Sequence, residues 1–419
     1  MAIQSLNTLT LLLLVCITIL FIVSTSNAFI LADGSSNYHI NSQSSHLNKN
    51  LQQMSLFRTN SKYHTNQGDG LKQHRRWLVV DFDGTCTEKD TTPLLPYLAA
   101  AYCSTCHQRD KEDDISHEKD LQNRLSQFKV LEDEYMRLLG ETYTNLFSDN
   151  DKGGEEEIER QSIYEVLHAL DDPSIQVTKM VSDSRLLGGL GHASSHEISE
   201  ILADDDKHNI QVSLKDGCSD VLARILLNKP DAADMNQSSS NEPLCSGWSL
   251  AVLSINWCPS LIDAALIQPL LKKRRSILQI EHCDTEIPVW SNRVDEEGVV
   301  LLEVPGALAK RDRIKELRRH IHENDERTGS SSIIIYVGDS TTDLAALLEA
   351  DIGIIIGESS SIMMIAERYG VKIIPSKKRG SSDSIESSCE EKILWQVDRW
   401  SEIDELLLEV DQVYIEHNI

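Results

Sequence analysis

One short stretch, residues 77–87, constrains the fold more than any other. Trp77 to Val80 is an apolar run of the length and character of a buried strand in a parallel sheet. Asp81 and Asp83 follow, and Gly84 comes directly after them, where the chain can turn and bring its backbone close to a ligand. Two carboxylates so close repel unless one is protonated or a cation lies between them. The stretch therefore predicts an α/β fold with a ligand site at the end of its first strand.

A second apolar run predicts another strand that ends in a polar side chain. Leu250 to Leu253 reads as a buried strand, Ser254 follows it, and Asn256 lies two residues further on. A hydroxyl at a strand end, beside the backbone N–H groups of the next turn, can bind phosphoryl oxygens. Serine ends many strands, so the phosphate-binding role of Ser254 depends on the other motifs of the chain.

Two stretches in the C-terminal half add a cation and two more carboxylates. Lys310 stands at the start of a predicted helix whose apolar face includes Ile314. Residues 333–337 predict a buried strand that is followed by Gly-Asp, and a second aspartate, Asp343, comes four residues after Asp339. Acidic groups are favourable near a helix N-terminus, and here both aspartates are expected at the carboxyl edge of the sheet.

In this order, the four stretches resemble the motifs of the haloacid-dehalogenase (HAD) superfamily of phosphohydrolases. The resemblance implies a Rossmann-like parallel sheet with helices on both faces and a helical cap of the C1 type inserted after the first motif. The core would then comprise residues 75–90 and 245–419, and the cap residues 91–244. A cap closes over a small substrate and excludes water, so a small phosphate ester is the expected partner.

The resemblance also implies a role for each motif residue. Asp81 would attack phosphorus, and Asp83 would protonate the leaving oxygen and then activate water. The substrate phosphoryl group would be bound by Ser254, Asn256 and Lys310. Mg²⁺ is the expected cofactor, because its ligands would be hard oxygens. Those oxygens would come from Asp81, the backbone carbonyl of Asp83, Asp339 and Asp343.

Finer details resemble a narrower group, the thiamin monophosphate phosphatases of plant thiamin salvage. The shared details are a cysteine at 86, the Ser254-x-x-Trp257-Cys258 pattern, and residues 338–353. Gly84 departs from that group, in which a bulkier residue is expected. Two alternatives stay open: another small-molecule phosphatase, acting on phosphoserine, a nucleotide or a sugar phosphate, or a non-catalytic HAD protein that only binds.

Charge narrows the choice of partners. The formal net charge of −26 argues against a nucleic-acid binder, which needs a basic surface. The sequence leaves the oligomeric state open.

The first 74 residues have the composition of targeting segments. Leu9 to Val23 is apolar and uncharged, and small residues at Ser26 and Ala28 predict signal-peptide cleavage after residue 28. Residues 29–74 are rich in serine and poor in acidic residues, as transit peptides are. Together with Phe29 after the cleavage point, they resemble the two-part presequences of algae with secondary plastids. We expect a plastid protein with no membrane segment in its mature form; secretion, an endomembrane location or a retained anchor are the alternatives.

Overall fold

The computed structural model describes most of the chain after residue 75. The described ranges are 76–107, 114–147, 162–204, 210–227, 247–280, 286–328, 332–378 and 392–416. The predicted signal and transit segments lie outside them. So do three stretches whose polar composition predicts loops, residues 149–159, 231–242 and 380–391. Within these ranges, every helix is too short or too polar to cross a membrane.

A seven-stranded sheet in the order β3-β2-β1-β6-β7-β9-β8 forms the centre of this region, and all its neighbouring strands are parallel. The strands are β1 Arg76–Val80, β2 Trp248–Leu253, β3 Val289–Trp290, β6 Ile333–Gly338, β7 Ile352–Ile356, β8 Lys372–Pro375 and β9 Ile393–Val397. A separate antiparallel pair joins β4 Arg293–Val294 to β5 Val300–Leu301. The predicted α/β fold is confirmed. The three strands that end in motif residues, β2, β1 and β6, are neighbours at the centre.

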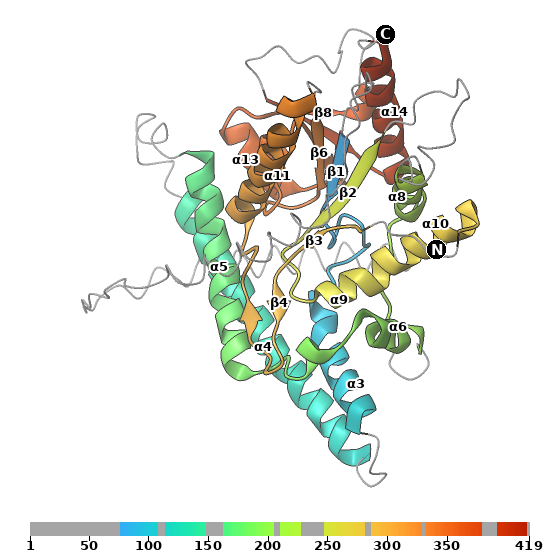
Figure 1. Cartoon of the computed structure of the whole chain (residues 1–419). Helices are drawn as coiled ribbons and strands as arrows, with labels where there is room; N and C mark the ends of the chain where they lie inside the picture. The colour runs from blue at the N-terminus through green and yellow to red at the C-terminus, as the bar shows by residue number, and fades with distance from the viewer. Residues whose placement is uncertain are drawn as a thin grey trace, which may run out of the picture. The chain divides into compact units, whose positions relative to one another are not determined.

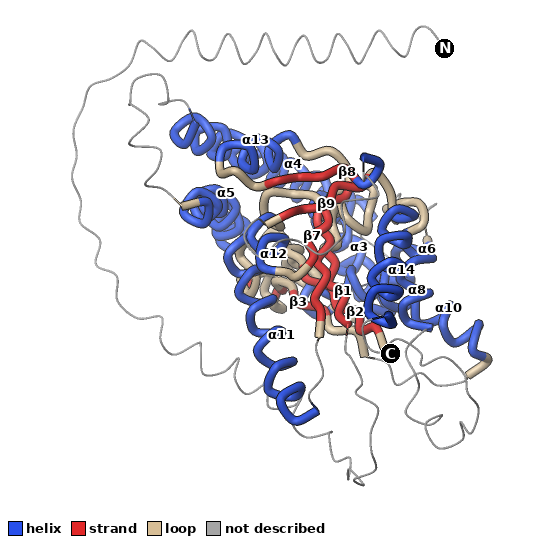
Figure 2. Tube along the Cα trace, turned by 90° about the horizontal axis from the view of Figure 1, so that it is seen from above, coloured by secondary structure: helices blue, strands red, loops and turns tan. Residues whose placement is uncertain are grey.

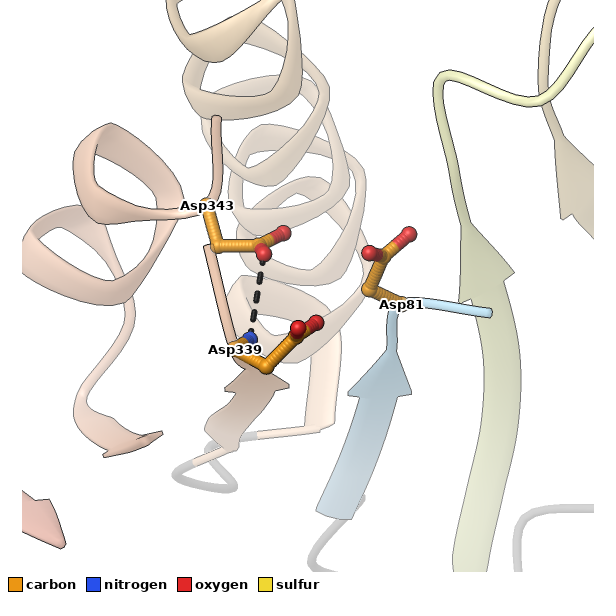
Figure 3. A group of neighbouring side chains, drawn as sticks. All are labelled: Asp81, Asp339 and Asp343. Atoms are coloured by element: carbon orange, nitrogen blue, oxygen red, sulfur yellow. Dashed lines mark hydrogen bonds between the residues drawn. The ribbon is translucent and has the colours of Figure 1, made fainter. Parts of the chain in front are cut away.

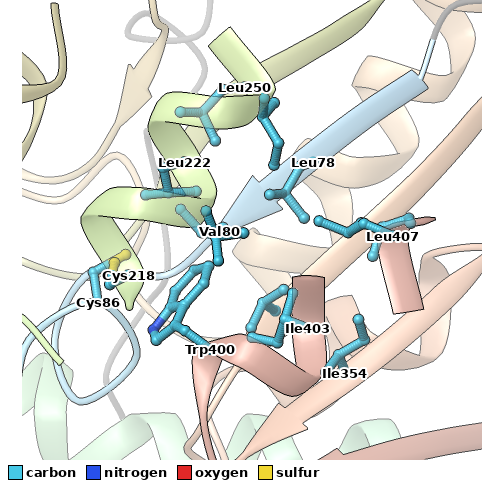
Figure 4. Close-up of a cluster of buried hydrophobic side chains, with 14 of the residues drawn as sticks. Leu78, Val80, Cys86, Cys218, Leu222, Leu250, Ile354, Trp400, Ile403 and Leu407 are labelled. Atoms are coloured by element: carbon cyan, nitrogen blue, oxygen red, sulfur yellow. The ribbon is translucent and has the colours of Figure 1, made fainter. Parts of the chain in front are cut away.

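Helices cover both faces of the sheet (Figures 1 and 2). The alternation along β1 explains why: Leu78 and Val80 point into one apolar cluster and Val79 into the other. Figure 4 shows the first cluster, where Trp400 and Ile403 pack against β1. Its helices are α8 Cys218–Leu227, α10 Gln268–Leu278 and α14 Trp400–Glu416. The opposite face carries α11 Ala307–Thr328, α12 Leu344–Glu349 and α13 Ser360–Arg368.

A third apolar cluster holds the inserted helices together. These are α3 Leu95–His107, α4 Asp114–Phe147, α5 Ile163–Ser184 and α6 Ser195–Ala203, and α9 Pro259–Ile262 packs with them. Apolar spacing predicts helices within residues 126–147, 163–170 and 198–202, and α4, α5 and α6 are found there. The sequence also predicts a helix start with Thr91 or Thr92 as its cap and Pro93 in its first turn, and the structure has a short 3₁₀ turn there, Thr92–Leu94. Tyr97, Tyr102 and Tyr135 pack against this cluster.

One part of the chain differs from the sequence prediction. The apolar residues of 395–410 predict one closing helical segment, but 393–397 form β9, which lies between β7 and β8, and only then does α14 begin. Leu394, Trp395 and Val397 are apolar enough to form a buried strand, and their alternation is too short to distinguish from a helix. Residues 221–227 predict a helix that returns to the sheet, and α8 does pack on the sheet against β2 and α14, at the end of the range 91–244 expected for the cap.

Candidate active site

Three carboxylates meet where β1 and β6 end. Val80 and Val337 are paired in register, so Asp81 and Asp339 leave adjacent strands at the same edge, and Asp343 returns to that edge at the start of α12. One oxygen of each carboxylate lies within 4.8 Å of one of each of the others (Figure 3). All three were predicted as metal ligands, and the structure brings them together.

Lys310 supplies the positive charge at this cluster. Its Nζ lies 3.1 Å from Asp81 Oδ1 and 2.7 Å from Asp343 Oδ1, and the side chain is fully buried. Burial alone would lower the pKa of Lys310, but Asp343 and Asp81 outweigh it and raise that pKa above the ordinary lysine value. The side chain is therefore a fixed ammonium group beside the predicted nucleophile.

Asp343 is the best-satisfied carboxylate of the three. Besides Lys310, it accepts the hydroxyl of Tyr336 at 2.7 Å and both the backbone N–H and the hydroxyl of Ser340, at 3.0 and 2.8 Å. Burial would raise its pKa, but Lys310 and these donors hold it below the ordinary value. A Cβ at Gly338 would lie 2.4 Å from the Asp343 Cγ, so only glycine fits there.

The charges and donor atoms at this cluster fit a divalent cation. Burial, with its carboxylate neighbours, raises the pKa of Asp81 well above the ordinary value, and burial raises the pKa of Asp339 to about 6. Three carboxylates face one lysine, and an anionic phosphate would add more negative charge. Oxygen ligands of this kind suit Mg²⁺. Asp81, Asp339 and Asp343 would hold it, and the fourth predicted ligand, the backbone carbonyl of Asp83, stays a prediction.

Asp83 faces a different set of partners. Its Oδ1 accepts the backbone N–H and the hydroxyl of Thr91, at 2.8 and 2.6 Å, and its Oδ2 accepts the side-chain amide of Asn256 at 2.8 Å. Burial and the nearby Asp90 raise the pKa of Asp83, while these donors work against the rise. A raised pKa keeps a proton available on the carboxyl group, which suits a general acid.

Of the two predicted residues that follow β2, Asn256 contacts Asp83 and Ser254 contacts Asn256. Ser254 Oγ accepts the backbone N–H of Asn256 at 3.2 Å, and Ser254 is fully buried. Asn256 Nδ2 donates to Asp83 and, at 3.0 Å, to the hydroxyl of Thr91, while its Oδ1 accepts the Cys258 N–H at 2.8 Å. Asn256 was predicted to bind substrate. In this structure it supports Asp83, and a direct contact with substrate stays a prediction.

Gly84 has a structural reason of its own. Its φ of +69° favours glycine, and a Cβ there would lie 2.3 Å from Asp339 Oδ2. The next residue, Thr85, donates its hydroxyl to Asp339 Oδ1 at 2.7 Å. In this chain, a bulkier residue at 84 would displace a predicted metal ligand.

Two residues of the apolar cluster in Figure 4, Trp400 and Cys86, hydrogen-bond the backbone of the loop after β1. The Trp400 indole N–H donates to the carbonyl of Thr85 at 3.1 Å, and the Cys86 thiol donates to the carbonyl of Asp81 at 3.1 Å. Cys86 and Cys218 are free and fully buried. Burial raises the pKa of the Cys86 thiol, so it is an unreactive part of the core.

Sequence reasoning missed several supports of the site. The sequence predicts only a capping role for Thr91 or Thr92, whereas the Thr91 hydroxyl donates to Asp83. Tyr336 was read as part of an apolar strand, although a tyrosine between isoleucine and valine in a fully buried run signals a hydroxyl in need of a partner. Asp171, discussed below, had no local signal except a carboxylate on the apolar face of a helix.

A parallel sheet, an inserted helical region, carboxylates after β1 and β6, and a buried lysine between them form an arrangement that resembles the HAD phosphatases, as the sequence predicted. Comparison with known proteins gives a likeness to a plant protein. The chain is 24% identical over 352 residues to the Bifunctional TH2 protein, mitochondrial, of Arabidopsis thaliana. The match covers 81% of this chain and 50% of that relative, so the chain spans about half the relative's length.

Other comparisons give more distant likenesses. No protein-family model matches the chain. A solved structure of a phospho-aspartyl intermediate analogue of phosphoserine phosphatase has 13% identity and a TM-score of 0.34, covering 80% of this chain and 99% of its own. A HAD family hydrolase from Salmonella enterica serovar Typhi has 12% identity and a TM-score of 0.31, with 77% and 75% covered.

Proposed function

We propose that the chain is a metal-dependent phosphomonoesterase that acts through a covalent aspartyl phosphate. One observation carries the proposal: Asp81 and Asp83 leave the same strand end but have separate environments. Asp81 lies beside Lys310 and two further carboxylates, where a phosphoryl group and a cation can be held. Asp83 is held by Thr91 and Asn256, with a raised pKa that suits proton transfer.

The first half-reaction transfers the phosphoryl group to the protein. A carboxylate oxygen of Asp81 attacks phosphorus, the bond from phosphorus to the ester oxygen breaks, and Asp83 gives its proton to the departing alcohol. Lys310 offsets the charge on the phosphoryl oxygens. A bound divalent cation would add Lewis-acid charge stabilisation and orient the phosphate.

The second half-reaction returns Asp81. Asp83, now ionised, accepts a proton from water, the water oxygen attacks phosphorus, and the bond to Asp81 breaks. Inorganic phosphate leaves and Asp83 is again protonated. The same carboxyl group thus serves as acid and then as base.

For the substrate, the proposal is thiamin monophosphate. It is supported by the narrow motif pattern around Cys86, Ser254 and residues 338–353, and by the likeness to the plant TH2 protein. Phosphoserine, a nucleotide or a sugar phosphate would keep the same chemistry and change only the contacts made by the cap. The plastid location likewise rests on the composition of residues 1–74.

Phosphate release by the purified full-length chain tests the proposal. The panel is thiamin monophosphate, phosphoserine, nucleoside monophosphates and sugar phosphates, each with Mg²⁺ and with EDTA, and Asp81→Asn is the control. We expect Mg²⁺-dependent release with a clear preference for thiamin monophosphate, absent in the control. Preference for another ester would overturn the substrate and keep the chemistry. No release from any ester would favour the non-catalytic binding protein.

A further inference from the structure

A buried carboxylate from helix α5 lies at the first turn of the helix that carries Lys310. Asp171 is 6% exposed, and its Oδ1 accepts the backbone N–H of Ala307, the first residue of α11, at 3.0 Å. Lys310 comes three residues later, and its own N–H bonds the carbonyl of Gly306 at 3.1 Å. Asp171 therefore does for α11 what an N-cap side chain does for an ordinary helix.

Helix α11 has no such side chain of its own. Gly306 stands at the N-cap position, and the first turn contains no acidic residue. A Cβ at Gly306 would lie 2.1 Å from the Asp171 Cγ and 2.2 Å from its Oδ1. The backbone of Gly306 is not left-handed, so its conformation does not require glycine. Glycine is required because a Cβ would occupy the space of the Asp171 carboxylate.

Helix α5 also connects the sheet side of the molecule to the inserted helices. Val166 and Leu167, in its first half, belong to the apolar cluster that includes Ala307. Val177 and Val181, in its second half, belong to the cluster of the inserted helices. A displacement of α5 would therefore displace the group that caps α11.

The ionised form of Asp171 is disfavoured by burial at this position. Burial raises its pKa to about 6, although the N–H groups of Ala307 and Leu308 and the charges of His168 and Lys310 act to lower it. A buried carboxylate that costs free energy when ionised is more readily kept for a positioning role than for packing alone.

We propose that Asp171 is a positioning residue, which caps α11 from the inserted helices and so holds Lys310 between Asp81 and Asp343. Lys310 is then correctly placed to bind the phosphoryl group only while α5 packs against α11. The effect on turnover rests on the function proposed above, but the contact itself does not.

Variants of the full-length chain test the role of the carboxylate. Asp171→Ala should lower kcat by about 10- to 100-fold, because small misplacements of a catalytic group are costly. It should also weaken inhibition by inorganic phosphate. Asp171→Asn should stay within about threefold of wild type, because asparagine accepts the same N–H and ranks with aspartate at N-caps. Asp172→Ala is the matched control, since Asp172 is exposed on the same helix.

A double-mutant cycle tests the fit between the two residues. Gly306→Ala should lower kcat about as much as Asp171→Ala, because the new Cβ displaces the carboxylate. In the Asp171→Ala background, however, the same change should cost less than about twofold, because the clash is gone. Gly140→Ala is the control, since nothing lies near a Cβ at that helical position.

Hydrogen exchange separates this inference from the proposed function. In Asp171→Ala, the amides of residues 307–310 should exchange faster than in wild type, whether or not any ester is hydrolysed. If wild type releases no phosphate, the proposed function fails and exchange still tests the contact. Unchanged exchange in Asp171→Ala, or an equal loss from Gly306→Ala in both backgrounds, would overturn the inference.

Discussion

Asp81 and Asp83 are two residues apart, but the molecule supports them from different directions. Asp81 and its partners Lys310, Asp339 and Asp343 all come from the sheet and the helices on it. Asp83 bonds Thr91, at the start of the inserted region, as well as Asn256 after β2. One carboxylate is thus built into the rigid edge of the sheet, and the other is tied to the junction with the cap. Under the proposed function, Asp81 is the nucleophile and Asp83 transfers the proton.

The largest loss of activity should come from changing Asp81, the carboxylate at the edge of the sheet. Asp81→Asn should reduce phosphate release at least about a thousandfold, because the attacking oxygen is lost. The loss should be equal for alkyl phosphates and for p-nitrophenyl phosphate, since both need the nucleophile. Steady-state kinetics measures it, and thermal unfolding checks that the variant is folded. Retention of more than a few per cent of activity would remove Asp81 from the nucleophile role.

The cap side should give a loss that depends on the leaving group. Asp83→Asn should slow the hydrolysis of an alkyl phosphate about 100-fold or more, the usual scale of general acid–base catalysis. Release from p-nitrophenyl phosphate should fall less, because nitrophenolate leaves without a proton. A loss independent of the leaving group would contradict the division of roles between Asp83 and Asp81.

The supports of Asp83 should have a smaller effect, visible in the pH profile. Thr91→Val and Asn256→Ala each remove a donor that lowers the pKa of Asp83, so that pKa should rise further in each variant. The basic limb of kcat/KM reports the general acid, and it should move to higher pH, with a rate loss of about tenfold.

The neighbouring hydroxyl provides the control for this pH shift. Thr92→Val makes the same substitution at the next residue and should leave the basic limb of the kcat/KM profile at its wild-type pH. A limb that stays fixed in both Thr91→Val and Asn256→Ala would mean that Asp83 is not the titrating acid.

The same division explains what the sequence could predict. The sheet side follows from local patterns, because an apolar run followed by aspartate at β1 and β6 places both carboxylates at one edge. Lys310 could be placed by its position at a helix start. The partners of Asp83 could not be predicted, since Thr91 and Asn256 come together only after the chain has folded. The same holds for the contact of Asp171 with Gly306 at the start of α11. Gly84 was noted as an unexpected residue, and its reason, the closeness of Asp339, is likewise a tertiary one.

The smallest predicted effect is on the free energy of unfolding, and it comes from Asp171 on α5. The pKa of Asp171 is raised from 3.8 to about 6. A carboxyl with a higher pKa in the folded state stabilises the fold when protonated, so its contribution is full below pH 3.8 and is lost as the pH rises through 6. Between pH 5 and pH 8, wild type should lose about 1 kcal/mol that Asp171→Asn keeps. Denaturant unfolding of both proteins at each pH measures the difference. Parallel losses in the two proteins would show that Asp171 is already ionised at no cost in the fold, and its contact with α11 would then be an ordinary cap.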